Sequence, residues 1–129
     1  MKARDKLLGP LESEVMAVAW QKGSVLVGEL TEQINRRRPV PLAYKTVLTI
    51  CTRLAEKGLL AHTREGRAFR YAPTMSEAEF LDEQAAKAAA AMLDTFGLTA
   101  IAAFVGQVSA SPRDFDALRT LVAEASKES

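Results

Sequence analysis

Two cations and two hydroxyl groups follow one another within a single stretch of the chain, residues 43–57. If this stretch is helical, Lys45, Thr49 and Arg53 recur every four residues and share one face, with Thr46 beside them. Cationic side chains bind phosphate, and short hydroxyl side chains reach base edges in the major groove of DNA. The pattern favours contact with double-stranded DNA. A solvated helix face that is basic by chance is the alternative.

The other side of the same stretch is apolar and indicates its secondary structure. Val47, Ile50, Cys51 and Leu54 lie at positions i, i+3, i+4 and i+7, the spacing of one stripe along an α-helix. We therefore predict a helix over Ala43–Lys57 with this stripe against a core. Cys51 is the only cysteine of the chain, which excludes an internal disulfide and predicts a buried structural thiol.

Two helices and a brief extended segment must hold this basic helix in place. Pro10 is tolerated in the first turn of a helix and Gly23 is a common helix end, so the two residues bound the first helix. Residues 24–26 are apolar and suit a short strand. The second helix is predicted over Val27–Arg37, followed by a turn over residues 38–42. Two helices joined by a short connection, with the basic face on the second, form a helix-turn-helix.

Two strand-like runs follow the basic helix, residues 59–64 and 67–72, around a tip that contains Gly66. This pattern predicts a β-hairpin, and a hairpin directly after the recognition-type helix makes the unit a winged helix. Arg64 and Arg67 flank the tip, where their guanidinium groups can reach the sugar-phosphate backbone. We therefore count both arginines among the DNA-binding residues.

The remaining side chains of the hairpin divide between its two faces. Phe69 and Tyr71 alternate with Arg70, so the aromatic rings are expected to face the helices while the arginine faces out. His62 is the only histidine of the chain, and no Cys, Asp or Glu cluster lies near it in the sequence. We expect it to be a partly exposed strand residue and predict no bound metal.

Charge divides the chain into two parts of opposite sign. Residues 1–72 contain thirteen Lys and Arg against seven Asp and Glu, a net charge of +6, whereas residues 73–129 contain four against nine, a net charge of −5. The first part has the sign that attracts a polyanion. We place the domain boundary at this change, with a winged helix DNA-binding domain over residues 1–73 and a helical domain over residues 74–129.

The second part is predicted to be entirely helical. Ser76 and Glu79 match a capping box at the start of a long helix that Gly97 ends. A further apolar segment covers residues 98–108, and a last helix is expected to bury Phe115, Leu118, Leu121 and Val122. Fewer than about 60 residues of helix bury little surface alone, so we predict a homodimer formed through residues 74–129. Packing of this part back onto the basic unit is the alternative.

The fold class is therefore mostly α with a small β-hairpin wing, a winged helix-turn-helix followed by an α-helical dimerisation region. The sequence holds no Ser/His/Asp set, paired acids, phosphate loop or metal-ligand spacing, so neither catalytic residues nor a cofactor are predicted and the protein is not an enzyme. No signal-type or membrane-spanning apolar run is present, which predicts a cytoplasmic protein. A ligand-controlled regulator and a protein-interaction module remain as alternatives.

Two motifs carry a resemblance to a known family. Residues 44–54 read Y-x-T-V-x-T-x-x-x-R-L and residues 65–73 read E-G-R-x-x-x-Y-x-P. With Leu11-Glu12, Met16 and Trp20, they resemble the penicillinase repressors, which control β-lactamase and methicillin-resistance genes. The resemblance implies a homodimeric repressor of transcription that binds inverted-repeat operators. It implies base contacts by Lys45, Thr46 and Thr49, phosphate contacts by Arg53 and the wing arginines, and a place for Tyr44 in the same interface.

The resemblance also implies how repression ends. A membrane-bound sensor protease responds to an antibiotic or envelope stress, and the dimerisation region is cleaved between an asparagine and a phenylalanine. The matching pair in this chain is Ala103-Phe104, in which the phenylalanine agrees and the alanine departs from the pattern. The copper-responsive branch of the family has a C-terminal cysteine cluster, and no cysteine follows Cys51 in this chain, which excludes a thiolate metal site in the tail.

Overall fold

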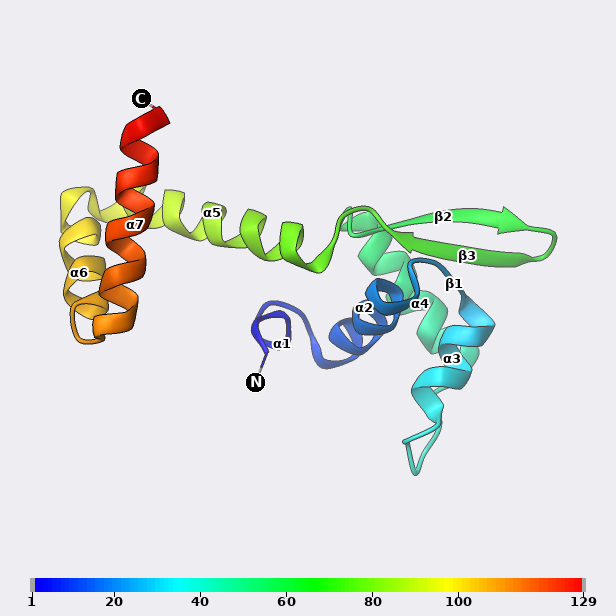
Figure 1. Cartoon of the computed structure of the whole chain (residues 1–129). Helices are drawn as coiled ribbons and strands as arrows, with labels where there is room; N and C mark the ends of the chain where they lie inside the picture. The colour runs from blue at the N-terminus through cyan, green and yellow to red at the C-terminus, as the bar shows by residue number, and fades with distance from the viewer. Residues whose placement is uncertain (1, 129) are drawn as a thin grey trace. The chain divides into compact units, whose positions relative to one another are not determined.

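A computed structural model describes residues 2–128, which form two compact units that divide between residues 83 and 84 (Figure 1). The first unit contains four helices, a three-stranded sheet and the start of a fifth helix. The helices are α1 (Ala3–Leu7), α2 (Pro10–Lys22), α3 (Val27–Asn35), α4 (Tyr44–Glu56) and the first part of α5 (Glu77–Phe96). This element order confirms the predicted fold class, a mostly helical winged helix-turn-helix.

The sheet of the first unit is antiparallel and has the order β1-β3-β2. Its strands are β1 (Val25–Leu26), β2 (Leu60–Glu65) and β3 (Ala68–Pro73). The register pairs His62 with Tyr71 and Arg64 with Phe69, so these four side chains lie on one face of the hairpin. Gly66 turns the hairpin with a φ of 59°, a left-handed conformation that glycine adopts without strain.

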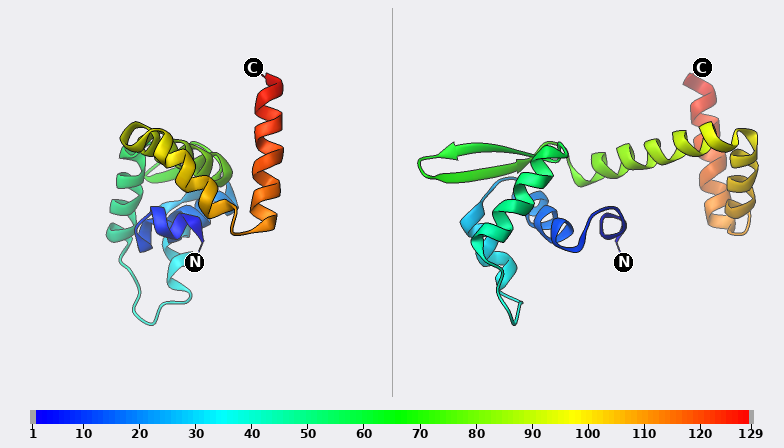
Figure 2. Two further views of the ribbon diagram at one scale, coloured as in Figure 1. Left: turned by 90° about the vertical axis from the view of Figure 1, so that its left-hand side faces the viewer. Right: turned by 180° about the vertical axis from the view of Figure 1, so that it is seen from behind.

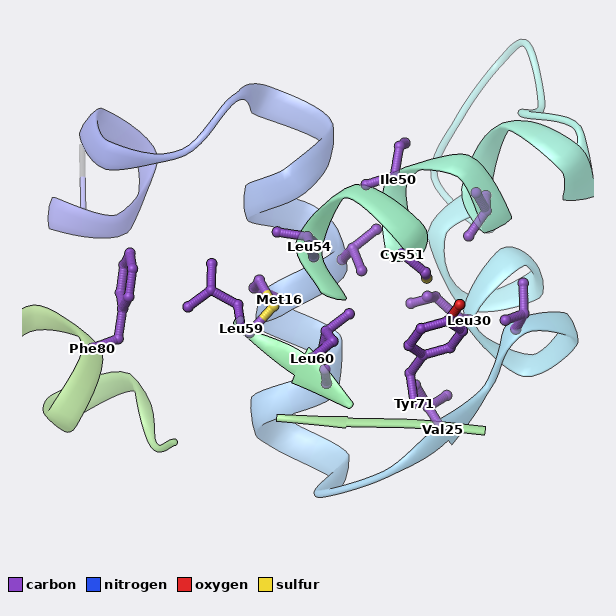
Figure 3. Close-up of a cluster of buried hydrophobic side chains, with 14 residues drawn as sticks. Met16, Val25, Leu30, Ile50, Cys51, Leu54, Leu59, Leu60, Tyr71 and Phe80 are labelled. Carbon is purple, nitrogen blue, oxygen red and sulfur yellow. The ribbon is translucent and has the colours of Figure 1, made fainter. Parts of the chain in front are cut away.

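One cluster of buried apolar side chains holds the first unit together (Figure 3). Its members come from α2, α3, α4, all three strands and the first turn of α5, and the largest that are fully buried include Met16, Leu30 and Leu54. The predicted stripe of α4 belongs to it, since Val47, Ile50, Cys51 and Leu54 are all buried.

The first turn of α5 packs against the N-terminal helices of the first unit. The Phe80 ring lies 5.7 Å from the Trp20 ring, and the Trp20 indole N–H donates a 3.0 Å hydrogen bond to the Met75 carbonyl. The Arg4 guanidinium pairs with the Glu77 carboxylate at 3.0 Å. The start of α5 is therefore fastened to the first unit by an aromatic pair, an indole hydrogen bond and an ion pair.

The sequence did not reveal two features of this unit. Helix α1 was not predicted, because it is held by partners far along the chain, Glu77 for Arg4 and Ser13 for Asp5. The second helix ends at Asn35 rather than at the predicted Arg37. The Asn35 side chain accepts a hydrogen bond from the Leu42 N–H at 2.8 Å and donates one to the Leu42 carbonyl at 2.9 Å, and this pair of bonds closes the turn that leads to α4.

The second unit consists of the rest of α5, α6 (Leu98–Val108) and α7 (Pro112–Glu128). The predicted capping box at the start of α5 is confirmed, with hydrogen bonds from the Ser76 N–H to the Glu79 carboxylate and from the Glu79 N–H to the Ser76 hydroxyl. Gly97 separates α5 from α6 with a φ of 58°.

The predicted burial of the last helix is wrong for a single chain. Phe115, Leu121 and Val122 of α7 are 38%, 62% and 56% exposed, and Leu118 is half-buried. Three helices are too few to cover one another's apolar faces. Among residues 84–128 the one buried side chain is that of Ala100.

Candidate nucleic-acid interface

Helix α4 presents the predicted polar face to solvent. Lys45, Thr46, Thr49 and Arg53 are all exposed, on the side of the helix away from the buried stripe, and Tyr44 in the first turn is 45% exposed. The stripe fixes the rotation of the helix, because turning it would move the apolar side chains out of the core. All five residues of α4 that the sequence assigns to DNA are therefore open to solvent, and Lys45, Thr46, Thr49 and Arg53 share one face.

The Thr49 hydroxyl is already engaged as a donor within the helix. It donates a 2.9 Å hydrogen bond to the Lys45 carbonyl, one turn earlier. The oxygen lone pairs and the methyl group remain for an incoming base. A hydroxyl in this state accepts from an amino group on a base edge, and the methyl group can contact the methyl group of thymine.

Some cationic side chains of the first unit form ion pairs with acidic side chains, and others do not. Arg4, Arg38, Lys57 and Arg70 form ion pairs with Glu77, Glu14, Glu12 and Glu65. Within residues 2–128, by contrast, Lys45 and Arg53 of α4 and Arg67 of the hairpin tip form no ion pair. The cations that the sequence assigns to DNA therefore carry positive charge that no carboxylate in the described part of the chain pairs with directly.

The two arginines at the tip of the hairpin differ in how they are held. The Arg64 Nε donates a 3.0 Å hydrogen bond to the Gly66 carbonyl, and its guanidinium lies 6.0 Å from the centre of the Phe69 ring. Arg67 is exposed and extends from the turn. Arg64 is thus braced over an aromatic ring with its terminal N–H groups open, whereas Arg67 has a freer side chain.

Arg70 of the hairpin differs from both tip arginines because it forms an ion pair. Its Nε lies 2.8 Å from the Glu65 carboxylate and a terminal nitrogen donates a 3.2 Å hydrogen bond to the Ser24 hydroxyl. The hydrogen bond to Glu65 raises the pKa of Arg70 above its ordinary value. The prediction that Arg70 faces away from the aromatic rings is confirmed by the register, but its side chain is half-buried and paired rather than free.

A groove of about 680 Å³ separates α4 from the hairpin (Figure 2, right, where the hairpin projects from the end of α4). Leu48, Leu60, Phe69 and Tyr71 supply its apolar lining, and Thr52, Glu56 and His62 supply its polar groups. Sequence reasoning missed this groove. The signal for it was the alternation of Leu60, His62 and Arg64 along one strand, which places the three on the same face.

The described part of the chain contains no set of side chains that could bind a metal ion. No group of three His, Cys, Asp or Glu side chains lies close enough together within residues 2–128 to hold an ion. Burial raises the pKa of the Cys51 thiol to about 11, so the thiolate that a metal needs is disfavoured. No helix among residues 2–128 has the length and apolar character needed to cross a membrane.

Comparisons with known proteins match nearly the whole chain. The family model of the penicillinase repressor matches residues 8–124. The transcriptional regulator BlaI of Mycobacterium tuberculosis is 37% identical over 119 residues, which cover 91% of this chain and 83% of that protein. The penicillinase repressor of Bacillus licheniformis is 34% identical over 71 residues, so the match spans 55% of this chain and about half of that protein, 54%. The structure of RosR from H. salinarum is similar in fold, with a TM-score of 0.51, 15% identity and coverage of 99% and 100%.

Proposed function

This chain belongs to the penicillinase repressor family, a family of winged-helix transcriptional repressors and not of enzymes, and we propose that it acts as a homodimer on an inverted-repeat DNA operator. Helix α4 enters the major groove in each half-site. Lys45, Thr46 and Thr49 read base edges from the N-terminal half of the helix, with Tyr44 beside them. Arg53, Arg64 and Arg67 bind phosphates and set the register of the protein on the duplex.

One observation carries this proposal: the exposed face of α4 combines unpaired cations with hydroxyl groups and lies opposite the buried stripe. A helix that only had to remain soluble would mix acids into that face, and the first acid of α4 is Glu56 at its last residue. Arg64 and Arg67 at the tip of the hairpin that follows α4 supply two further cations, which a wing can bring to the DNA backbone. The face thus provides both base readout and phosphate binding.

The second unit supports the homodimer. Ten large apolar side chains of residues 84–128 are 38% to 81% exposed in the single chain, and they include Phe96, Leu98 and Phe104. Exposed apolar surface of this extent on helices marks an association face. A second copy presents the same face, so an isologous contact covers both at once. The dimer holds two basic units at a set separation, which requires a two-fold symmetric DNA site.

A selection from random-sequence duplexes tests the proposal directly. The full chain is mixed with a pool of duplexes that contain a randomised core, and bound duplexes are recovered and sequenced at two salt concentrations. The expected product is an inverted repeat whose two halves are about one or two helical turns apart, bound less tightly by several orders of magnitude as salt rises. Recovery of no enriched sequence, together with binding that does not change with salt, would favour a protein-interaction module instead.

We further propose that repression ends by cleavage between Ala103 and Phe104. Both residues lie in the middle of α6, and Phe104 is 59% exposed in the single chain. A cut there divides the helix that supplies much of the exposed apolar surface, so each fragment loses its partner face. A single basic unit retains only half of the phosphate contacts, and its affinity falls by orders of magnitude.

Mass spectrometry of the protein from its own cells tests the cleavage. Cells are grown with and without a β-lactam or another envelope stress that a membrane-bound sensor protease would detect. The expected fragment begins at Phe104, and a Phe104→Gly variant should accumulate uncut. An intact chain under conditions that relieve repression would contradict the proposal and would direct the search towards a small ligand.

A further inference from the structure

His62 lies in the groove between α4 and the hairpin with its imidazole held against two aromatic rings. The centroid of the His62 imidazole lies 5.9 Å from that of the Phe69 ring and 5.6 Å from that of the Tyr71 ring. The imidazole is edge-on to Phe69 and tilted relative to Tyr71. Among residues 2–128 no hydrogen bond to the imidazole is formed, and the residue is exposed. The ring is therefore positioned by packing while both nitrogens stay available to a ligand in the groove.

Arg64 extends the same face towards the hairpin tip. It follows His62 by two residues on β2, so both side chains lie on one side of the strand, and its guanidinium rests over the Phe69 ring that also contacts His62. The two side chains thus form a row of nitrogen donors on one face of the hairpin, with His62 in the lining of the groove and Arg64 beyond it towards the tip. Thr52 on α4 lines the opposite wall, and its hydroxyl donates a 2.9 Å hydrogen bond to the Leu48 carbonyl.

The place of this row relative to α4 indicates what the groove receives. When a helix lies in the major groove and the adjacent hairpin lies beside it, one phosphate backbone must pass between the two elements. The groove lies between these elements, and its lining residues Leu48 and Thr52 are the sequence neighbours of Thr49 and Arg53 on α4. Building on the DNA-binding function proposed above, we propose that His62 is a further phosphate-binding residue and that its protonation makes DNA affinity depend on pH.

The charges around His62 set the sign of this dependence. The charged group that lines the groove beside His62 is Glu56 on α4, and the Tyr71 phenol is the titratable group on β3. Arg64 lies beyond His62 on β2, with its guanidinium over the Phe69 ring. A phosphate beside the ring favours the imidazolium, so DNA binding takes up a proton and affinity rises as the pH falls. Histidine side chains change charge between about pH 5 and 8, the range in which this contact would vary.

The composition of the chain allows a pH dependence of DNA affinity to be assigned to His62. His62 is the only histidine, and the single cysteine, Cys51, is buried with its pKa raised to about 11. A terminal amino group is the other protein group that titrates near neutrality. Variants of His62 separate the two sources, because they change the imidazole and leave the terminus as it is.

The experiment measures the affinity of the full chain for the selected inverted repeat at pH 6.0 and pH 8.0 at fixed ionic strength. We expect wild-type affinity to fall by roughly tenfold from the lower to the higher pH, as two wings each lose one exposed charge contact. The His62→Gln variant should bind the repeat weakly, with an affinity nearly independent of pH. The His62→Lys variant should bind it tightly at both pH values. Thr63→Ala, on the opposite face of the same strand, should keep the wild-type dependence, and thermal unfolding checks that each variant folds.

The outcomes separate this inference from the function on which it rests. If the wild type binds the selected duplex and His62→Gln retains the full pH dependence, the phosphate contact is overturned while the repressor function stands. Wild-type binding that is equal at the two pH values overturns it as well. If the wild type binds no duplex at either pH, the proposed function fails and the inference falls with it.

Discussion

Glu12 and Lys57 join the start of α2 to the residue that follows α4, with the Lys57 ammonium 2.8 Å from the Glu12 carboxylate. Glu12 also accepts a 3.3 Å hydrogen bond from the Gly9 N–H, so one carboxylate caps α2 and fastens the end of the basic helix. The hydrogen bond from Lys57 is the main cause that lowers the pKa of Glu12, and the Gly9 N–H and the charge of Arg53 act in the same direction.

This pair predicts a pH-dependent contribution to stability. A carboxyl whose pKa is lowered by folding stabilises the protein above its unfolded-state value of 4.5, and the contribution is lost as the pH falls through the folded-state value. Glu12→Gln should therefore lower the free energy of unfolding by about 0.5–1 kcal/mol at pH 7, since Lys57 is largely exposed, and by much less near pH 3. Urea unfolding at both pH values measures it. Glu32→Gln on the exposed face of α3 is the control, and an equal loss at both pH values would contradict the ion-pair explanation.

Arg53 should act on all DNA sequences alike. Because a phosphate contact contains no base information, Arg53→Ala should weaken binding to selected and unrelated duplexes by similar factors. The slope of log affinity against log salt should fall by about 0.9 per subunit. Fluorescence anisotropy across a salt series measures both effects, with Arg119→Ala of α7 as the control. Unchanged affinity would remove Arg53 from the interface.

Thr49 should contribute to base preference. Its exposed oxygen and methyl group predict that Thr49→Ala costs roughly 1–3 kcal/mol of discrimination at one base position in each half-site. Thr120 of α7 makes the same kind of hydroxyl-to-carbonyl bond, to Asp116 at 3.1 Å, so Thr120→Ala is a control for the loss of that bond alone. An even drop of affinity across all base substitutions would instead identify Thr49 as a backbone contact.

Glu56 should oppose DNA binding. It is the acidic residue of the groove between α4 and the hairpin, and a carboxylate there repels a phosphate backbone. We expect Glu56→Gln to raise affinity for any duplex by roughly two- to fivefold at low salt, and the gain should shrink as salt rises. Glu32→Gln again serves as the control, because α3 lies outside the groove. A loss of affinity in Glu56→Gln would show that the carboxylate positions another contact.

The exposed apolar side chains of α7 should decide the oligomeric state. Leu121 is 62% exposed in the single chain, so Leu121→Glu should leave each chain folded and still separate the two copies. Sedimentation velocity should show a monomer, and affinity for the selected inverted repeat should fall by at least about a hundredfold. Lys127→Glu in the last turn of the same helix should remain dimeric. A Leu121→Glu protein that sediments as a dimer would locate the interface elsewhere.

The sequence was informative where structure depends on local spacing. The stripe from Val47 to Leu54, the capping box at Ser76 and Glu79 and the glycine at the hairpin tip each lie within about eight residues, and each feature is present in the structure. The orientation of the α4 face follows from the same stripe. Periodicity therefore predicted the winged helix and the exposure of the face assigned to DNA.

Features that depend on distant residues could not be predicted in this way. Helix α1 needs Glu77, the end of α4 needs Glu12, and the position of His62 needs the register of β2 against β3. None of these pairings leaves a periodic signal in either partner. The exposure of the apolar side chains of α7 was not predicted for a related reason. Helical spacing identifies an apolar face but does not identify what covers it.

The position of Cys51 has a practical consequence. Its thiol is fully buried on the core side of α4, and it is the only one in the chain. A thiol-reactive dye can therefore label this protein only when the unit around α4 opens, so the labelling rate measures how often that opening occurs. Binding of a duplex should lower the labelling rate, so a single spectroscopic trace reports how much of the protein is bound to DNA without any engineered tag.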